Sequence, residues 1–335
     1  MEQSKNRKVL VIGGAGYIGS VLVGRLLDSK DNVVALDNFL YNNQRSLTDI
    51  MDQPSFSFIQ GDFCDNAILD KAMKGVTDVV LLAALVGDPM CKKYPDEAKR
   101  INLDGSINLI KRLNSYPLDN FVFLSTCSNY GLRDTDEPAD EKAELNPKSL
   151  YAETKVGVEQ YLCENSDNLS YDWTILRSAT AFGLSPRMRF DLTISEFTRE
   201  LALGRELLVY DADTWRPYCH VDDISTAIIK VLEVTEKKAS GQIFNVGSNN
   251  ENHTKKSIVD IISTHLKDGH VKYVQGGRDP RNYRVNFDKI SRVFDFQAER
   301  TVEDSVIELI KNIKAGCFVD IESKKNFFGN YFMNQ

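Results

Sequence analysis

The amino-acid sequence predicts an α/β fold, in which a doubly wound parallel sheet is followed by a smaller C-terminal α/β lobe. Short β-rich runs alternate with longer amphipathic stretches through the first half of the 335 residues. These runs are almost continuously apolar, which is typical of parallel strands covered by helices on both faces. After about residue 181 the alternation breaks down. The sequence therefore indicates one large sheet domain and a less regular second lobe.

Parallel strands and covering helices can be assigned in order along the first half. The expected strands are residues 8–12, 32–36, 56–60, 78–83, 121–125 and 173–176. The expected helices, whose apolar positions recur at helical spacing, are residues 17–28, 96–113 and 150–163. Because crossovers between parallel strands are right-handed, these helices would cover both faces of the sheet.

The second half holds fewer and more scattered elements. The expected elements are a loop rich in Arg and Pro at 184–189, helices at 193–202 and 222–234, strands at 207–210 and 242–246, and a basic, turn-rich segment at 276–284. We place the first domain at residues 1–180 and the second lobe at residues 181–335, with residues 219–247 returning to the first sheet.

Composition and charge limit the possible classes of function. A formal net charge of −7 argues against a nucleic-acid or anionic-membrane surface, which would need a concentrated basic face. The longest apolar run, residues 79–86, is too short to span a bilayer. Six scattered cysteines without a secretion signal favour free thiols in the cytoplasm. Four histidines without ligand-like spacing make a metal site unexpected.

A glycine-rich turn directly follows the first expected strand. Gly13, Gly16 and Gly19 have the spacing that allows a tight turn, close approach of a pyrophosphate, and close packing of helix on strand. The amides at the start of the next helix, at Tyr17 and Ile18, would point at the phosphates. Glycine-rich turns also occur for purely structural reasons, so this motif is ambiguous by itself.

Acidic residues end the next two expected strands. Asp37, beside Asn38, stands where a carboxylate hydrogen-bonds the adenosine ribose, and its charge would repel a 2′-phosphate. Asp62, before Phe63, is a candidate contact to adenine, and a turn residue is an equally good explanation. With the glycine turn, these residues predict a Rossmann-type domain that binds NAD rather than NADP, and Ala83 is a further candidate contact.

A Tyr and a Lys stand four residues apart at the start of the helix expected at 150–163. Tyr151 and Lys155 therefore share one helix face. A free Tyr has a pKa of about 10, and a nearby ammonium with oxidised nicotinamide favours the phenolate. Such a pair by itself usually marks a solvated helix face. A hydroxyl from the turn at 125–131, which follows a strand, could hold a substrate alcohol against Tyr151.

Together these residues resemble the extended short-chain dehydrogenase/reductase family, specifically its nucleotide-sugar epimerases and dehydratases. The resemblance covers nearly the whole chain and includes Asn102 and residues 215–223. It implies Tyr151 as acid/base, Thr126 as the hydroxyl that orients the substrate, and Lys155 as a ligand of the nicotinamide ribose. It also implies NAD as cofactor, a nucleotide-diphosphate sugar as substrate, and a homodimer formed through a four-helix bundle.

The resemblance also suggests substrate contacts. Arg216 matches the family arginine that meets the diphosphate, and Arg278 or Arg281 is a candidate for a second such role. Arg187 and Arg189 are candidate diphosphate or sugar contacts, or else part of a solvated basic turn. The remaining expected substrate contacts are Thr126, Cys127, Ser128 and Thr180. The aromatic tail at 327–332 is expected to pack on the second lobe.

Two departures from the family bear on the reaction. The family's 4,6-dehydratases carry Asp-Glu after the orienting hydroxyl, where this chain has Cys127 and Ser128. The second departure is Leu82, where many relatives carry His, and it is expected to change packing rather than catalysis. The loop that follows, at 85–91, has an unusual apolar and acidic mixture that suggests an atypical sugar environment. We expect a 4-epimerase, or a 4-dehydrogenase of a deoxysugar or heptose nucleotide. A dehydratase that uses Cys127, buried packing of that thiol, and a catalytically silent dinucleotide-binding regulator remain alternatives.

Overall fold

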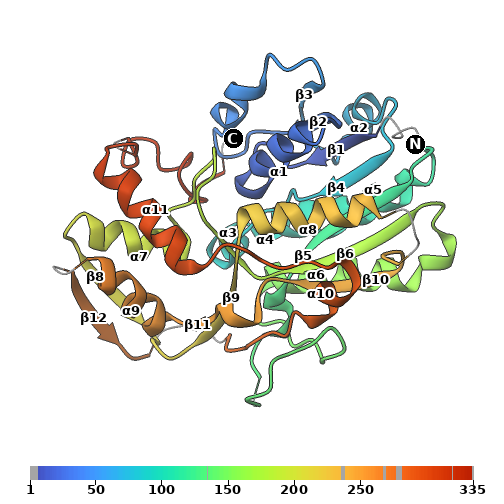
Figure 1. The fold of residues 1–335 in the computed structure, drawn as a ribbon. Helices are drawn as coiled ribbons and strands as arrows, with labels where there is room; N and C mark the ends of the chain where they lie inside the picture. The colour runs from blue at the N-terminus through green and yellow to red at the C-terminus, as the bar shows by residue number, and fades with distance from the viewer. Residues whose placement is uncertain are drawn as a thin grey trace.

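A seven-stranded parallel sheet forms the centre of the computed structural model, which describes residues 7–133, 135–234, 238–266, 269–276, 281–318 and 320–333. The strand order is β10-β6-β5-β4-β1-β2-β3, which reverses between β1 and β4 as in a doubly wound sheet (Figure 1). The strands are β1 (Lys8–Ile12), β2 (Asn32–Asp37), β3 (Phe56–Gln60), β4 (Asp78–Leu81), β5 (Asn120–Thr126), β6 (Asp172–Ser178) and β10 (Gln242–Val246).

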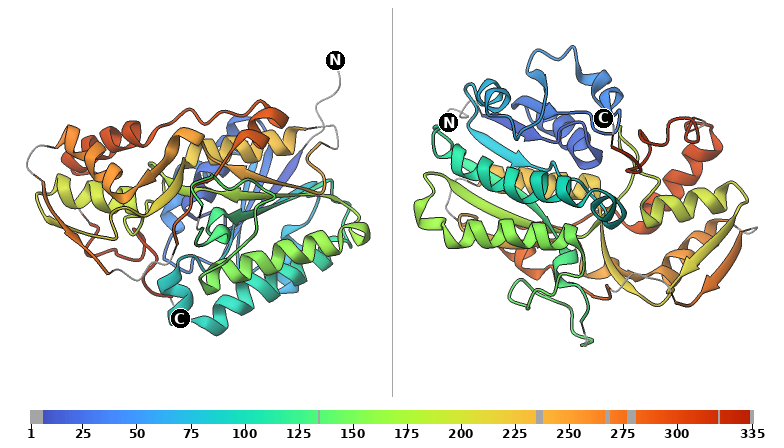
Figure 2. Two further views of the ribbon diagram at one scale, coloured as in Figure 1. Left: turned by 90° about the horizontal axis from the view of Figure 1, so that it is seen from below. Right: turned by 180° about the vertical axis from the view of Figure 1, so that it is seen from behind.

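Alternation along the strands gives the sheet two apolar faces. On one face, Val9 and Val11 of β1 belong to the core that includes α1 (Tyr17–Asp28) and α8 (Val221–Glu233). On the other, Leu10 and Ile12 belong to the core under α2 (Asn66–Ala72), α5 (Ser106–Leu113) and α6 (Leu150–Glu164). Figure 2 shows the sheet between these two helical layers. The predicted fold class is confirmed.

Two local features differ from the sequence prediction. The fourth strand ends at Leu81 because the amides of Leu82 and Ala83 both bond the carbonyl of Ile12, which ends the ladder. The helix expected at 96–113 contains a π-helical turn, Lys99–Gly105, between α4 (Pro95–Ala98) and α5. Periodicity alone does not distinguish such a turn from a continuous α-helix.

The second lobe contains two small sheets and several helices. One sheet has the order β11-β9-β7 and the other pairs β12 with β8. The elements are β7 (Thr180–Phe182), α7 (Thr193–Ala202), β8 (Glu206–Tyr210), β9 (Trp215–His220), β11 (Asn252–Thr254), α9 (Lys255–His265), β12 (His270–Val274) and α11 (Val302–Lys314). Helix α10 (Asp288–Phe294) packs instead on β10 of the large sheet. Within the region expected to return to the first domain, β10 pairs with β6 and α8 packs on the large sheet, whereas β9 stays in the lobe.

The lobe is not separate from the sheet domain. Tyr17 and Ile18, at the start of α1, pack in the same apolar cluster as Phe182 and Tyr218 of the lobe. The hydroxyl of Tyr17 also donates a 2.6 Å hydrogen bond to the carbonyl of Gly183. These contacts hold the lobe beside the carboxyl ends of the strands. Across the described ranges, no helix has both the length and the apolar character needed to cross a bilayer.

Candidate active site

A cavity of about 610 Å³ lies between the carboxyl ends of the strands and the second lobe. Gly13, Asp37, Ala83 and Thr126, at or just after the ends of β1, β2, β4 and β5, all line it. This is the position where open α/β sheets bind ligands, beside the point at which the strand order reverses. The cavity also reaches Thr180 in the lobe.

The glycine turn is shaped for close approach of a ligand. Gly13 has a φ of +89°, and a Cβ there would lie 2.7 Å from the backbone nitrogen of Ala83. A Cβ on Gly19 would collide with the carbonyl oxygen of Gly13. Gly16 caps α1 without a side-chain hydrogen bond, and Tyr17 and Ile18 line the cavity. The turn therefore presents the amides at the start of α1 to the cavity, which fits a pyrophosphate.

Asp37 is held firmly at the end of β2. Its two carboxylate oxygens accept hydrogen bonds from the amides of Ala15, at 3.1 Å, and Phe39, at 2.8 Å. Burial raises the pKa of Asp37, and those backbone hydrogen bonds oppose the shift. Asp37 and Asn38 both line the cavity, so this carboxylate stands where a ribose hydroxyl donor would fit.

The sequence left open whether Asp62 is a turn residue or lies in the ligand site, and the structure shows it in both positions. It closes a turn by accepting from the amide of Cys64 at 2.9 Å, and it also lines the cavity together with Phe63. Arg100 lies 3.2 Å from its second oxygen.

Helix α6 brings Tyr151 and Lys155 to the cavity. Its first turn is capped by Ser149, whose hydroxyl accepts from the amide of Ala152. Lys155 is 2% exposed, and its Nζ donates a 2.8 Å hydrogen bond to the carbonyl of Leu124 in β5. Burial lowers the pKa of Lys155 to about 8.

The surroundings of the Tyr151 phenol act on its pKa. Burial raises the pKa of Tyr151 well above that of a free tyrosine, and the nearby Cys91 and Asp88 act in the same direction. Lys155 Nζ lies 5.9 Å from the centre of the Tyr151 ring. The sequence prediction relies on Lys155 together with oxidised nicotinamide, and the phenolate that the two would favour stays a prediction.

The turn after β5 places Thr126 and Ser128 in the cavity but not Cys127. The hydroxyl of Thr126 accepts from the backbone amide of Ser128 at 3.1 Å, which holds the Thr126 side chain, and both residues line the cavity. Cys127 is 1% exposed, and its Sγ donates to the carbonyl of Arg177 at 3.2 Å, away from the lining residues. Burial raises the pKa of Cys127 well above the ordinary value. Cys127, which the sequence predicts as a substrate contact, does not line the cavity, because the turn directs its thiol under the site.

Four of the candidate arginines line the cavity, namely Arg187, Arg189, Arg216 and Arg281. Arg187 and Arg189 are 2% and 7% exposed, so the alternative of a solvated basic turn is wrong. Arg189 forms a two-point ion pair with Asp191. Arg281 forms an ion pair with Asp88. Arg278 lies outside the described residues.

The C-terminal segment contributes residues that the sequence analysis did not identify. Phe328 packs in the core of the second lobe, as predicted, but Asn330 and Tyr331 line the cavity. Arg187 donates to the carbonyl of Gly329 at 3.1 Å and to the side chain of Asn330 at 2.7 Å. No local sequence signal marks these contacts, since more than 140 positions separate the partners.

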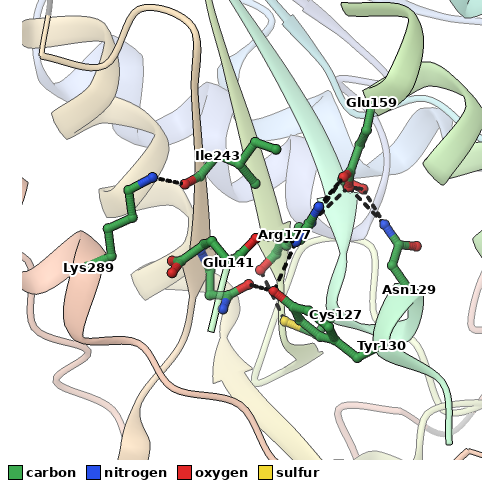
Figure 3. Close-up of polar contacts among 10 residues, drawn as sticks. Cys127, Asn129, Tyr130, Glu141, Glu159, Arg177, Ile243 and Lys289 are labelled. Atoms are coloured by element: carbon green, nitrogen blue, oxygen red, sulfur yellow. Dashed lines mark hydrogen bonds and ion pairs between the residues drawn. The ribbon is translucent and has the colours of Figure 1, made fainter. Parts of the chain in front are cut away.

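A second polar cluster lies beside the cavity, around Glu159 of α6. Figure 3 shows the carboxylate of Glu159 facing Arg177 and Asn129, with Cys127 and Tyr130 nearby. Glu159 accepts from Nη2 of Arg177 at 2.6 Å, and both side chains are almost fully buried. Neither Glu159 nor Arg177 is among the site residues predicted from the sequence.

Comparison with known proteins places this geometry in a family. The family model described as the NAD dependent epimerase/dehydratase family matches residues 9–247. The UDP-glucose 4-epimerase of Halalkalibacterium halodurans is 26% identical over 90% of this chain and 93% of its own length. The dTDP-glucose 4,6-dehydratase of Neisseria gonorrhoeae is 30% identical over 79% of this chain and 78% of its own length.

Among solved structures, the fold is similar to that of the UDP-glucuronic acid 4-epimerase of Bacillus cereus, crystallised with UDP-glucuronic acid and NAD. The TM-score is 0.83 at 24% identity, and the match covers 92% of this chain and 99% of that one. The family model spans most of the chain, and the glycine turn, Asp37, Tyr151 and Lys155 line one cavity. The chain belongs to the NAD-dependent epimerase/dehydratase family.

Proposed function

We propose that the protein acts at C4 of the sugar in a nucleotide-diphosphate sugar, as a 4-epimerase or a 4-dehydrogenase. The observation that carries this proposal is that Tyr151, Lys155 and Thr126 line the same cavity as the glycine turn and Asp37. A base, a cation and an orienting hydroxyl are then within one enclosed space, which is the arrangement that oxidation of an alcohol requires.

NAD is the cofactor of this family, and the residues of the cavity fit it. The turn at residues 13–19 would hold the pyrophosphate, Asp37 and Asn38 the adenosine ribose, and Asp62 and Phe63 the adenine. Lys155 and Ala83 would lie at the nicotinamide end. When bound, NAD supplies the acceptor for the hydride that leaves the sugar carbon.

The side chains of the site then divide the proton chemistry. Thr126 accepts or donates a hydrogen bond to the C4 hydroxyl and sets its direction. The oxygen of Tyr151, as phenolate, takes the hydroxyl proton while the carbon becomes a ketone, and it returns that proton when the ketone is reduced. An epimerase lets the ketone rotate within the cavity before reduction, whereas a dehydrogenase releases it.

The arginines supply the charge that a diphosphate needs. Arg216 and Arg281 are the proposed diphosphate contacts, and Arg187 and Arg189 are proposed for the diphosphate or the sugar. The Nε of Arg187 is buried and has no hydrogen-bond partner in the described part of the chain. A buried donor of this kind favours an anionic ligand.

The turn after Thr126 argues against a dehydratase. Dehydration needs an acid for the departing hydroxyl and a base for the C5 proton. The next two positions are Cys127, a buried thiol whose pKa is raised by burial, and Ser128. A relative that is a 4,6-dehydratase exists at 30% identity, so the product analysis below includes this outcome.

For the sugar we propose a deoxysugar or a heptose. Leu82, Leu85, Val86 and Met90 give the cavity an apolar wall beside Tyr151. A methyl group at C5, as in a 6-deoxysugar, could pack on this wall without leaving a polar group unpaired, so the wall supports the deoxysugar more than the heptose. Exchange of residues 85–91 for the loop of a UDP-glucose 4-epimerase should move the preference toward glucose. An unchanged preference would contradict this assignment.

We further propose a cytoplasmic homodimer in which α4, α5 and α6 of two subunits form a four-helix bundle. The helical run from α4 to α5 packs against α6 on one face of the sheet, as Figure 2 shows. The six cysteines are all free, which suits a reducing compartment. Sedimentation at micromolar concentration tests the dimer, and a monomer there would contradict it.

The experiment that tests the function adds GDP-, UDP-, dTDP- and CDP-sugars to the purified protein while the absorbance of reduced nicotinamide and the products are followed. Interconversion of two C4 epimers identifies a 4-epimerase. Persistent reduced cofactor and a keto-sugar that needs an outside oxidant for turnover identify a 4-dehydrogenase. A 4-keto-6-deoxy product would establish a dehydratase. The second candidate, a silent dinucleotide-binding regulator, would bind NAD and respond to none of the sugars; the presence of Tyr151 and Lys155 in the cavity disfavours it.

A further inference from the structure

Three ionisable side chains follow one face of α6 toward the protein interior. Tyr151, Lys155 and Glu159 are four residues apart, so they share that face. Tyr151 and Lys155 line the cavity, whereas Glu159 is 2% exposed and lies beyond its lining. The third member of the row is therefore out of reach of substrate but on the same rigid helix as the two groups proposed for catalysis.

The carboxylate of Glu159 joins α6 to two strands of the sheet. It accepts hydrogen bonds from the hydroxyl of Ser125 in β5 and from Nδ2 of Asn129 at 2.8 Å. It also accepts from Nε of Arg177 in β6 at 3.0 Å and from Nη2 at 2.6 Å. Figure 3 shows that Arg177 and Asn129 approach this carboxylate from different sides. Ser125 directly precedes Thr126, so Glu159 connects the helix of Tyr151 to the turn that carries the orienting hydroxyl.

Because Glu159 and Arg177 are buried, their ion pair depends on complete hydrogen bonding. A carboxylate and a guanidinium that are both almost fully buried are stable only when their hydrogen bonds are satisfied. Glu159 has at least three donating side chains, and Arg177 has additional contacts to the hydroxyl of Tyr130 and the carbonyl of Glu141. The bonds that satisfy the buried carboxylate therefore tie α6 to β5 as well as to β6.

Glu159 also affects the protonation of Lys155. Burial lowers the pKa of Lys155 to about 8, and the negative charge of Glu159 acts against that lowering. The other groups that face Lys155 are Tyr151 on its own helix and Cys91 of α3 (Asp88–Lys93). Burial raises the pKa of Cys91 to about 12, so this thiol is neutral near pH 7.

The other titratable groups near Glu159 are either neutral or positively charged near pH 7. Cys127, from the turn after β5, faces Glu159, and burial raises its pKa so that it too is neutral near pH 7. Cys163, one turn along α6, has a pKa that burial also raises. Arg177 of β6 is the cation that pairs with Glu159. The nearby anion that favours the ammonium form of Lys155 is therefore Glu159.

We propose that Glu159 is a positioning residue. It holds the helix of Tyr151 in a fixed position relative to Thr126, and it keeps Lys155 a cation at neutral pH. The proposal rests on the catalytic roles that we propose for Tyr151 and Lys155. Loss of the Glu159 charge then makes Lys155 give up its proton at lower pH, and the phenolate of Tyr151 loses the cation beside it.

The test compares Glu159→Gln with the wild-type enzyme. The alkaline limb of the pH profile of kcat/KM, where Lys155 becomes neutral, should move to lower pH by about one unit. Glu153→Gln is the matched control, because Glu153 is exposed on the same helix. This control should leave the limb in place. Glu159→Asp, which keeps the charge but shortens the side chain, should lower kcat and leave the limb near its wild-type position.

A second variant guards against loss of folding. Glu159→Gln leaves Arg177 buried without its partner, which is destabilising, so the double variant Glu159→Gln/Arg177→Met removes both charges together. A shift in the same direction, but smaller, is expected in this double variant, because loss of the Arg177 cation offsets part of the effect of losing the Glu159 charge. Lower melting temperature or activity with an unmoved limb in both variants would mean that the pair is only structural, and would overturn the proposal.

A readout without turnover separates this proposal from the proposed function. The titration of Lys155 is followed by NMR of isotope-labelled lysine side chains, with the signal assigned through Lys155→Met. We expect it to titrate at lower pH in Glu159→Gln than in the wild type. An unchanged titration would overturn the role of Glu159 and leave the proposed function standing. A shifted titration with an unshifted kcat/KM profile would overturn the control of the rate through Lys155 and count against the catalytic role of that lysine.

Discussion

Asp88 and Arg281 form an ion pair at the cavity wall, with 3.1 Å between Oδ2 of the aspartate and Nη1 of the arginine. Asp88 begins α3, after the apolar loop that follows β4, whereas Arg281 comes from the second lobe. The other oxygen of Asp88 is buried and has no hydrogen-bond partner among the described residues. A diphosphate that contacts Nη1 of Arg281 would compete with Asp88 for that group.

Replacement of Asp88 by Asn should strengthen the binding of a nucleoside diphosphate without its sugar. Removal of the competing charge leaves Arg281 available to the diphosphate, and a gain of about tenfold in affinity corresponds to one partly buried ion pair. Calorimetry measures the change, with Asp96→Asn, an exposed aspartate of α4, as the control. Weaker binding in Asp88→Asn would contradict competition and assign the ion pair to shaping of the site.

Replacement of Tyr151 by Phe should abolish turnover and leave NAD binding nearly intact. The phenol oxygen is the proposed proton acceptor, and loss of a general base lowers kcat by about 10² to 10⁴-fold. Tyr161→Phe is the control, since Tyr161 lies on the same helix, packs with the core under α2, α5 and α6, and does not line the cavity. Undiminished kcat in Tyr151→Phe would remove this residue from the proposed role.

Replacement of Asp37 by Asn should weaken NAD binding by about tenfold and reduce the preference for NAD over NADP. A hydrogen bond from a ribose hydroxyl to a carboxylate contributes about 1.5–3 kcal/mol, and Asn also removes the charge that repels a 2′-phosphate. Asp28→Asn, at the exposed end of α1, is the control. Binding of both cofactors is measured by fluorescence titration. An unaltered NAD to NADP ratio would mean that Asp37 only closes its turn through Ala15 and Phe39.

Replacement of Lys155 by Met should stabilise the protein at neutral pH while it removes activity. Burial lowers the pKa of Lys155 from 10.5 to about 8, so the folded state disfavours the cation by up to about 3 kcal/mol. Between pH 8 and 10.5 the unfolded chain binds the proton more strongly than the folded chain. The wild type therefore gains stability from this group as the pH rises through that range.

Thermal melts at several pH values check this prediction. The melting temperature of Lys155→Met should exceed that of the wild type at pH 7, and the difference should shrink as the pH rises from 8 to 10.5. A lower melting temperature at every pH would mean that the hydrogen bond from Lys155 to Leu124 outweighs the burial of the charge.

Several parts of the site could be predicted because their signals are local. The glycines at 13, 16 and 19 lie within one turn, and Tyr151 and Lys155 are related by helical spacing alone. Asp37 was found because a strand of continuous apolar residues ends at it. Such patterns depend on backbone geometry over a few residues, and the structure brings all of these residues to one cavity.

Other parts could not be predicted because they depend on partners distant in the sequence. Cys127 stands next to Thr126 and shares its polar turn, yet its thiol points to the carbonyl of Arg177, 50 residues away. The contact between Arg187 and Asn330 spans 143 positions. Local sequence patterns do not indicate such contacts, because the packing of whole helices and strands decides which side chains meet.

The sequence by itself determined the doubly wound sheet, the glycine turn and the helix that bears Tyr151 and Lys155, because periodicity and turn chemistry act over short distances along the chain. Only the tertiary structure decided which groups are buried and paired. It placed Cys127 under the site, joined Asp88 to Arg281 and set Glu159 against Arg177. Burial in turn decides the charge of Lys155 and Tyr151, because desolvation depends on everything that surrounds a group rather than on its neighbours in sequence.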